Sequence, residues 1–307
     1  MISDIKKEFL VLHLNRRNNG GNAALSNFSS NFAKYYKTAI NEAYIFEKLS
    51  DIWKVFNKQN VIIYSNPIIG VFLFWKRSSI QFIQSIDEDL FSEDDFPYFA
   101  VKVYRFLVTI SQKFNNSIKV FNSKFTLYHY RRLKRVTGVY DVVNNLLPRM
   151  NFHSAKSNPS AVWIGTNHRR KGFSELIKFA QLNPKIKFNA IFSGQSNSIK
   201  QNQMSNIKIF VNLQREEVYD ILKDSNFLIV TSSFESLCLP IYEGIMFENF
   251  VIAKESKYIF ANEMEDHVNI FEKPFKISPE NLKKSKFKFK DPTNVNLKLF
   301  LALKNEL

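Results

Sequence analysis

Short apolar runs alternate along the chain with longer segments in which apolar residues recur at helical spacing. Runs typical of buried strands cover residues 9–14, 60–64, 80–83, 117–122, 161–164, 188–192, 207–211, 226–230 and 250–253. Helical spacing covers 23–37, 42–57, 97–113, 173–182 and 214–223. Strands that alternate with helices over short distances predict an α/β fold, with one doubly wound parallel sheet in each half of the chain.

The polar stretch NFHSAKSNPS, residues 151–160, separates the two halves. We therefore expect an N-terminal domain over 1–152 and a second domain over 153–275. The remainder, 276–307, is a basic tail that ends in an apolar helix candidate, VNLKLFLAL. This helix either packs back on the first domain or contacts a membrane surface.

Composition narrows the class of protein. With 45% hydrophobic residues among 307, the chain can bury a large core, which excludes wholesale disorder. Its single cysteine, Cys238, excludes an intramolecular disulfide and fits a reducing compartment. No apolar run reaches the roughly 18–20 residues of a membrane span. The N-terminal MISDIKKEFLVLHLN has the pattern of a first strand rather than a signal peptide. We expect a cytoplasmic protein.

The net charge of +15 favours an anionic partner. Nucleic acid, an anionic membrane surface and phosphorylated substrates all fit. The sequence has no zinc-binding spacing, RNP motif or Arg-Gly repeat, so we expect no nucleic-acid partner. Residues 128–135, YHYRRLKR, concentrate four positive charges. They are either a solvated helix end or a contact with membrane or phosphate.

Two carboxylates mark the candidate site, in the stretch TSSFESLCLPIYEGIMFEN at 231–249. The apolar run at 226–230 precedes it, and Pro240 stands where a helix would take its first turn. Glu235 is thus expected in a loop and Glu243 near the helix start, at the carboxyl edge of a parallel sheet, where such folds bind ligands. Carboxylates can hold sugar hydroxyls, and helix-start N–H groups can hold phosphate. The alternative is an ordinary helix start with a favourable acidic residue.

The segment ESLCLPIYE resembles the E-x7-E signature of retaining glycosyltransferases of family 4, which have the GT-B fold. The resemblance implies two Rossmann-like domains facing a central cleft. It also implies that Glu235 lies by the donor sugar and that Glu243 holds the ribose hydroxyls of the nucleotide. Cys238 stands where many relatives carry glycine.

The segment GTNHRRKGF, residues 165–173, resembles the loop of that family in which an arginine and a lysine neutralise the nucleotide diphosphate. Lys171 matches the lysine, but Thr166 occupies the arginine position. Arg169 or Arg170 can take the arginine's place, because a guanidinium suits phosphate oxygens. A plain solvated basic loop is the alternative.

On the acceptor side, the residues NNGGN predict a turn after the first strand, and their pair Gly20 and Gly21 resembles the glycine pair at that place in the family. The alternative is an ordinary strand-to-helix turn. Gln84 and Ser85 occupy the position where relatives often carry a histidine. The carboxylate run that begins with Asp87 is either a solvated loop or a superficial match to the metal-binding D-x-D of another fold.

The predicted site residues fall into three groups. The catalytic group is Glu235, Lys171 and Arg170; the donor-binding group is Glu243, Thr166, Gly165, Arg169, Gly194, Leu237, Cys238 and Leu239; the acceptor-side group is Gly20, Gly21, Gln84, Ser85 and Asp87.

The resemblance implies a retaining glycosyltransferase that moves a hexose from a nucleotide sugar to a glycan acceptor. We expect this acceptor to be lipid-linked, in the synthesis of a bacterial surface polysaccharide such as lipopolysaccharide, capsule or O-antigen, which would place the protein peripherally on the inner face of the cytoplasmic membrane. No cofactor or metal is expected, since fixed positive charge can replace a metal. The alternatives are an inactive binding or scaffold subunit and a nucleotide-sugar epimerase.

Overall fold

The computed structural model describes residues 8–13, 20–44, 60–73, 76, 78–86, 98–147, 159–194, 204–290 and 296–307. The chain forms two compact units. Unit 1 comprises residues 1–146 and 290–307, and unit 2 comprises 147–289. The predicted boundaries after residues 152 and 275 stay predictions.

Unit 1 is built on a six-stranded parallel sheet in the order β2-β1-β3-β4-β5-β6. Its strands are β1 (Phe9–His13), β2 (Ile40–Tyr44), β3 (Val61–Tyr64), β4 (Ser79–Ile83), β5 (Ile118–Phe121) and β6 (Val136–Val139). In the register of the sheet, Phe9 of β1 lies between Ile40 of β2 and Val61 of β3. The order reverses at β1, which is the topological switch point of this sheet.

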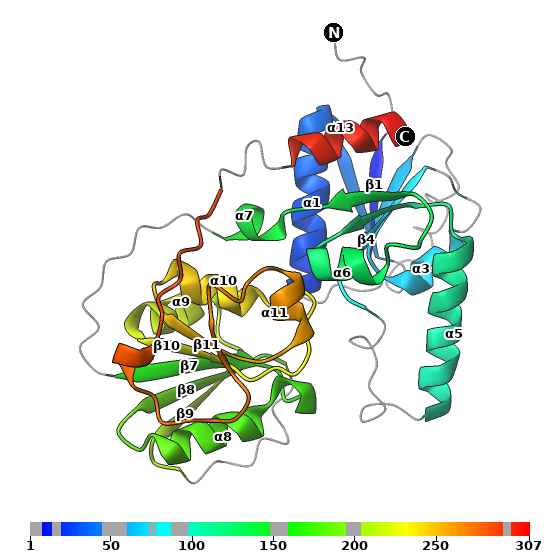
Figure 1. The fold of residues 1–307 in the computed structure, drawn as a ribbon. Helices are drawn as coiled ribbons and strands as arrows, with labels where there is room; N and C mark the ends of the chain where they lie inside the picture. The colour runs from blue at the N-terminus through cyan, green and yellow to red at the C-terminus, as the bar shows by residue number, and fades with distance from the viewer. Residues whose placement is uncertain are drawn as a thin grey trace. The chain divides into compact units, whose positions relative to one another are not determined.

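Helices cover both faces of this sheet (Figure 1). They are α1 (Gly20–Tyr36), α3 (Pro67–Phe72), α5 (Tyr98–Phe114), α6 (Lys124–His129), α7 (Val142–Leu146) and α13 (Leu297–Glu306). The C-terminal α13 crosses α1, where the ring of Phe300 packs against those of Phe28 and Phe32. The hydroxyl of Tyr36 donates to the carbonyl of Phe300 at 2.6 Å. The end of the chain therefore belongs to the core of unit 1.

Unit 2 contains a second six-stranded parallel sheet, in the order β12-β11-β10-β7-β8-β9. Its strands are β7 (Ser160–Gly165), β8 (Lys187–Phe192), β9 (Ile207–Val211), β10 (Phe227–Val230), β11 (Phe250–Lys254) and β12 (Asn269–Phe271). The order reverses between the central strands β7 and β10, so the switch point lies between them. Buried apolar residues such as Trp163, Phe179 and Phe188 form the core.

Within unit 2, α8 (Phe173–Leu182) covers one face of the sheet, and α9 (Arg215–Asp224) and α10 (Leu239–Met246) cover the other (Figure 1). This is the doubly wound arrangement that right-handed crossovers produce. The shorter elements are η2 (Arg169–Lys171), α11 (Lys257–Ala261) and η3 (Pro279–Asn281). The predicted α/β fold with one doubly wound parallel sheet in each half is confirmed.

Two local predictions are wrong. Gly20 and Gly21 do not form a turn: they are the first two residues of α1. The predicted helix over 42–57 is contradicted at its start, because residues 42–44 belong to β2, and its remainder lies outside the described residues. Strand β2 has one fully buried position, Ala43, so it lacks an apolar run like those of β1, β3 and β4.

No helix in the described part of the chain is both long and apolar enough to cross a membrane.

Candidate functional site

The candidate site lies at the switch point of unit 2. Two loops leave the carboxyl edge of the sheet there: residues 166–172 follow β7, and residues 231–238 follow β10. Because β7 and β10 are neighbours, the side chains carried by their loops meet. These loops contain Lys171 and Glu235, the residues at the centre of the predicted site.

Hydrogen bonds join the two loops. The hydroxyl of Thr231 donates to the carbonyl of Lys171 at 2.7 Å and accepts from the indole of Trp163 at 2.8 Å. The backbone N–H of Ser233 donates to the carbonyl of Arg170 at 2.9 Å. These bonds hold the η2 turn, which carries Arg170 and Lys171, against the end of β10.

Gly172 allows this close approach. Its φ of +70° lies in the left-handed region, and a Cβ atom there would stand 2.5 Å from the carbonyl oxygen of Thr231. Only glycine adopts this conformation without a steric cost. The glycine of the Lys-Gly pair therefore lets the lysine loop lie directly on the second loop.

The carboxylate of Glu235 faces two cations. Its Oε1 accepts a hydrogen bond from Nζ of Lys171, and its Oε2 lies 3.7 Å from Nη1 of Arg170. The same guanidinium nitrogen donates to the carbonyl of Phe234 at 3.2 Å. The side chain of Glu235 is only 11% exposed and that of Lys171 only 15%. The structure thus brings the three residues predicted to be catalytic into one cluster with a net positive charge.

Helix α10 begins beside this cluster. Its N-cap, Cys238, is buried, has a φ of 56° and makes no capping hydrogen bond through its side chain. Burial raises the pKa of the Cys238 thiol, and the nearby Glu235 carboxylate raises it further. Pro240 lies in the first turn, as predicted. The helix start therefore presents its positive dipole end next to the charged cluster.

Glu243, also on α10, is mostly buried and pairs with an arginine that the sequence did not single out. Its Oε1 lies 3.5 Å from Nη2 of Arg215, at the start of α9. Burial raises the pKa of Glu243, and Arg215 offsets part of this rise. A cation in the first turn of a helix is disfavoured by the macrodipole. An arginine at this unfavourable position is the one feature of the sequence from which Arg215 could have been predicted.

The other predicted donor-side residues lie along the same edge. Gly165 ends β7, and its carbonyl accepts from the N–H of Ser193 at 2.9 Å, which places Gly194 alongside. Thr166 is half-buried and Arg169 is exposed in η2. Leu237 is buried, and Leu239 is the first residue of α10.

The predicted acceptor-side residues lie in unit 1. The side-chain amide of Gln84 donates to the hydroxyl of Ser65 at 3.0 Å. The backbone carbonyl of Gln84 accepts from the side-chain amide of Asn122 at 2.8 Å. Both contacts lie where β3, β4 and β5 end. Ser85 is half-buried, and Asp87 lies outside the described residues.

One histidine at this edge of the sheet in unit 1 was not predicted from the sequence to be a site residue. His13 is the last residue of β1 and is buried. Its ring stacks on Tyr44 at 5.1 Å, and its Nε2 lies 3.9 Å from Oε1 of Glu42. The available signal was a histidine at the end of an apolar run. Among the described residues, no three His, Cys, Asp or Glu side chains cluster in a way that could hold a metal ion.

Comparison with known proteins gives similarity in structure but not in sequence. No protein-family model matches the chain, and no curated protein matches its sequence. Among solved structures, sucrose-phosphate synthase from Thermosynechococcus elongatus matches with a TM-score of 0.63 at 12% identity, over 87% of this chain and 86% of that one. WaaG, a glycosyltransferase involved in lipopolysaccharide biosynthesis, matches at 0.61 and 11%, over 97% and 94%. HepE from Anabaena, solved with UDP and glucose, matches at 0.59 and 13%, over 97% and 93%. The fold is GT-B, the fold of these three structures.

We expect Gly172→Ala to lower the free energy of unfolding by about 2 kcal/mol. Alanine is strained in the left-handed conformation, and its Cβ atom would clash with Thr231. Gly138→Ala is the matched control, since a Cβ there meets only the end of Leu299, at 3.4 Å. Urea unfolding of both variants measures the difference. Equal stability changes in the two would contradict the assigned role of Gly172.

Glu243→Gln is expected to stabilise the protein at pH 7. A carboxyl group with a raised pKa costs stability once it is ionised, and glutamine removes that cost. The advantage should shrink as the pH falls through the raised pKa and vanish below the ordinary value of 4.5, where the carboxyl group is neutral in both folded and unfolded chains. Urea unfolding from pH 7 to pH 4 tests this, with the exposed Glu272→Gln as control. Destabilisation at pH 7 would contradict it.

Proposed function

We propose that this protein is a retaining, metal-independent glycosyltransferase that transfers a hexose from a nucleotide sugar to a glycan acceptor. One observation carries the proposal: a mostly buried carboxylate, Glu235, faces Lys171 and Arg170 at the switch point of a doubly wound sheet. In open α/β sheets this is the position where ligands bind. The similarity in fold to a glycosyltransferase and to a protein solved with UDP and glucose supports the same class of substrate.

The residues present suit a sugar diphosphate. When the bond from the sugar C1 to the diphosphate breaks, negative charge develops on the leaving diphosphate. Lys171, Arg170 and the start of α10 stabilise that charge. Glu235 holds the sugar hydroxyls, and Glu243, oriented by Arg215, holds the ribose hydroxyls. The resembled motif has an arginine at the position of Thr166. Arg170 takes its place, because the guanidinium group of Arg170 already reaches Glu235.

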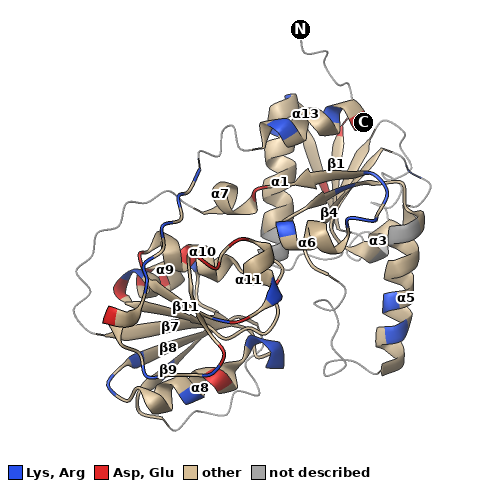
Figure 2. Ribbon diagram, in the orientation of Figure 1, with Lys and Arg blue, Asp and Glu red and all other residues tan. Residues whose placement is uncertain are grey.

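We also propose that the acceptor is lipid-linked and that the protein works at the cytoplasmic face of a membrane, in the synthesis of a bacterial surface polysaccharide. Helix α5 supports this. It exposes the apolar side chains of Phe99, Val103 and Phe106 beside the exposed cations Lys102 and Arg105. In Figure 2, the described part of α5 shows blue but no red. Aromatic and basic side chains together suit an anionic membrane surface.

A second candidate is an inactive, glycosyltransferase-like binding subunit. It is favoured by Thr166, which stands where the resembled motif has a phosphate-binding arginine. Such a subunit would not turn over any nucleotide sugar. A nucleotide-sugar epimerase, the remaining alternative, would interconvert the sugar without an acceptor.

Release of nucleoside diphosphate from a panel of UDP-, GDP-, CDP-, ADP- and dTDP-sugars tests the proposal. With extracted lipid-linked glycans as acceptors, we expect one donor class to be consumed. Lys171→Ala should lower kcat by on the order of 10²- to 10³-fold, the usual effect of removing one donor to a developing anion. Glu243→Ala should chiefly raise KM for the donor.

Lys178→Ala is the control, because Lys178 is an exposed lysine of α8 that pairs only with Glu175 among the described residues. Thermal melts show whether each variant is folded. Full activity in both site variants would refute the assigned roles. If the wild-type protein consumes no donor, the binding-subunit candidate replaces the enzyme.

A further inference from the structure

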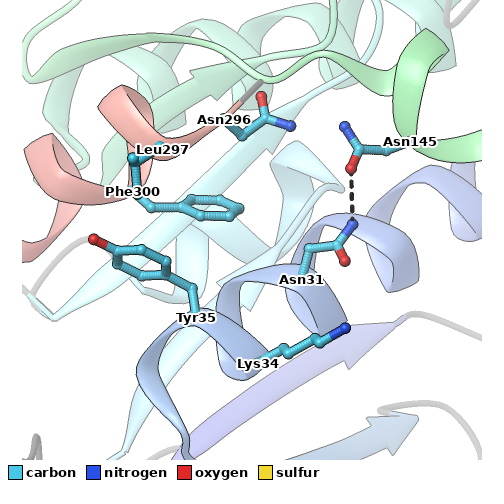
Figure 3. A pocket seen from close by; sticks show the side chains of 7 residues that line it. All are labelled: Asn31, Lys34, Tyr35, Asn145, Asn296, Leu297 and Phe300. Atoms are coloured by element: carbon cyan, nitrogen blue, oxygen red, sulfur yellow. Dashed lines mark hydrogen bonds between the residues drawn. The ribbon is translucent and has the colours of Figure 1, made fainter. Parts of the chain in front are cut away.

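A pocket of about 380 Å³ with polar and apolar lining lies in unit 1. It is lined by residues of α1, α7 and α13 and by Asn296, the N-cap of α13 (Figure 3). Three of its lining residues are asparagines, one is a lysine and two are aromatic. None of the described residues that line it is acidic. The pocket thus offers carboxamides, one cation and an aromatic wall.

Asn296 provides a buried hydrogen-bond donor that no described residue pairs with. The side chain is 5% exposed, and its Oδ1 accepts from the backbone N–H of Asp141 at 2.9 Å. This bond fixes the orientation of the side-chain amide, so its Nδ2 group points away from the N–H group of Asp141. Nδ2 has no hydrogen-bond partner among the described residues. Because a buried donor that stays unpaired costs stability, a ligand acceptor at this position is the expected partner.

The opposite wall of the pocket is apolar. The rings of Tyr35 and Phe300 lie 5.4 Å apart at an angle of 45°, so they contact each other rather than leave a slot between them. This arrangement does not suit a base stacked between two rings. It suits a ring whose faces carry C–H groups and whose edges carry hydroxyls.

The polar side of the pocket is held in place and carries charge. Nδ2 of Asn31 donates to Oδ1 of Asn145 at 3.2 Å and to the hydroxyl of Tyr140 at 2.7 Å, which fixes both carboxamides. Lys34 is one helical turn from Asn31 and places its ammonium group on the same side (Figure 3). A ligand with an anionic group fits this side.

The part of the pocket that α1 forms lies away from the start of that helix. Helix α1 begins after β1, at the carboxyl edge of the sheet, and runs back along it. Asn31 and Tyr35 lie 11 and 15 residues after Gly20. At about 1.5 Å per residue, they are roughly 16 to 22 Å from the start of the helix.

We propose that this pocket binds one sugar residue that carries an anionic group, a carboxylate or a phosphate, of a glycan chain. The sugar face lies on Tyr35 and Phe300, a ring or hydroxyl oxygen accepts from Asn296, and the anionic group pairs with Lys34. The site does not depend on the function proposed for unit 2. It would hold a glycan whether or not unit 2 transfers a sugar.

Isothermal titration of the full chain with glucuronate, glucose 6-phosphate, glucose and inorganic phosphate tests the proposal. We expect glucuronate, glucose 6-phosphate or both to bind, and glucose and phosphate to bind at least about tenfold more weakly, because each lacks one half of the recognised chemistry. Binding of glucuronate alone identifies a carboxylate sugar, and binding of glucose 6-phosphate alone identifies a phosphorylated one. No binding of either, or equal binding of phosphate alone, would overturn the proposal.

Two variants place the binding in this pocket. Lys34→Met keeps the aliphatic stem and removes the charge. Asn296→Asp keeps the oxygen that accepts from Asp141 and removes the amide donor. Each should weaken binding at least about tenfold.

Lys298→Met, on the exposed side of α13, and Lys171→Ala, in unit 2, should leave it unchanged. If Asn296→Asp does not fold, Lys34→Met alone decides, since Lys34 is exposed. Unchanged affinity in Lys34→Met would refute the site.

Discussion

The contact of Glu235 with Lys171 and Arg170 is the interaction on which the candidate site depends. A mostly buried ion pair adds little net stability, because the loss of hydration offsets much of the attraction between its charges. Here it lies where the strand order of unit 2 reverses, at the edge where α/β sheets bind ligands. The cluster contains two cations for one carboxylate. This excess positive charge favours the binding of a diphosphate more than it favours the stability of the fold.

The backbone around the cluster is shaped to allow this contact. Gly172 adopts a positive φ so that the lysine loop can lie against Thr231, and Cys238 adopts one at the start of α10. A non-glycine residue in that conformation is strained by roughly 1–2 kcal/mol. Strain of this kind persists where the surrounding structure imposes it, often at functional sites. Glycine in the resembled family would avoid that strain at the position of Cys238.

Much of the fold and part of the site could be predicted from the sequence. Apolar runs and helical spacing indicated two parallel sheets, and the order of the motifs placed Lys171 and Glu235 in loops that follow strands. That these two strands are neighbours is shown only by the structure. Strand β2 was missed because only Ala43 in it is fully buried. Arg215 reaches Glu243 from a helix 28 residues away in sequence. Asn296 shares its pocket with Asn31 of α1, near the other end of the chain. No local pattern reports such contacts.

Binding of nucleoside diphosphates tests the central claim most directly. A thermal-shift series with UDP, GDP, CDP, ADP and dTDP needs neither the acceptor nor the sugar. A ligand at about 100 times its Kd stabilises the folded chain by about 2.7 kcal/mol, which is a measurable shift. We predict a shift with one of the five diphosphates, lost in Glu243→Ala and reduced in Lys171→Ala. No shift with any diphosphate, or an unchanged shift in both variants, would contradict the proposed donor site.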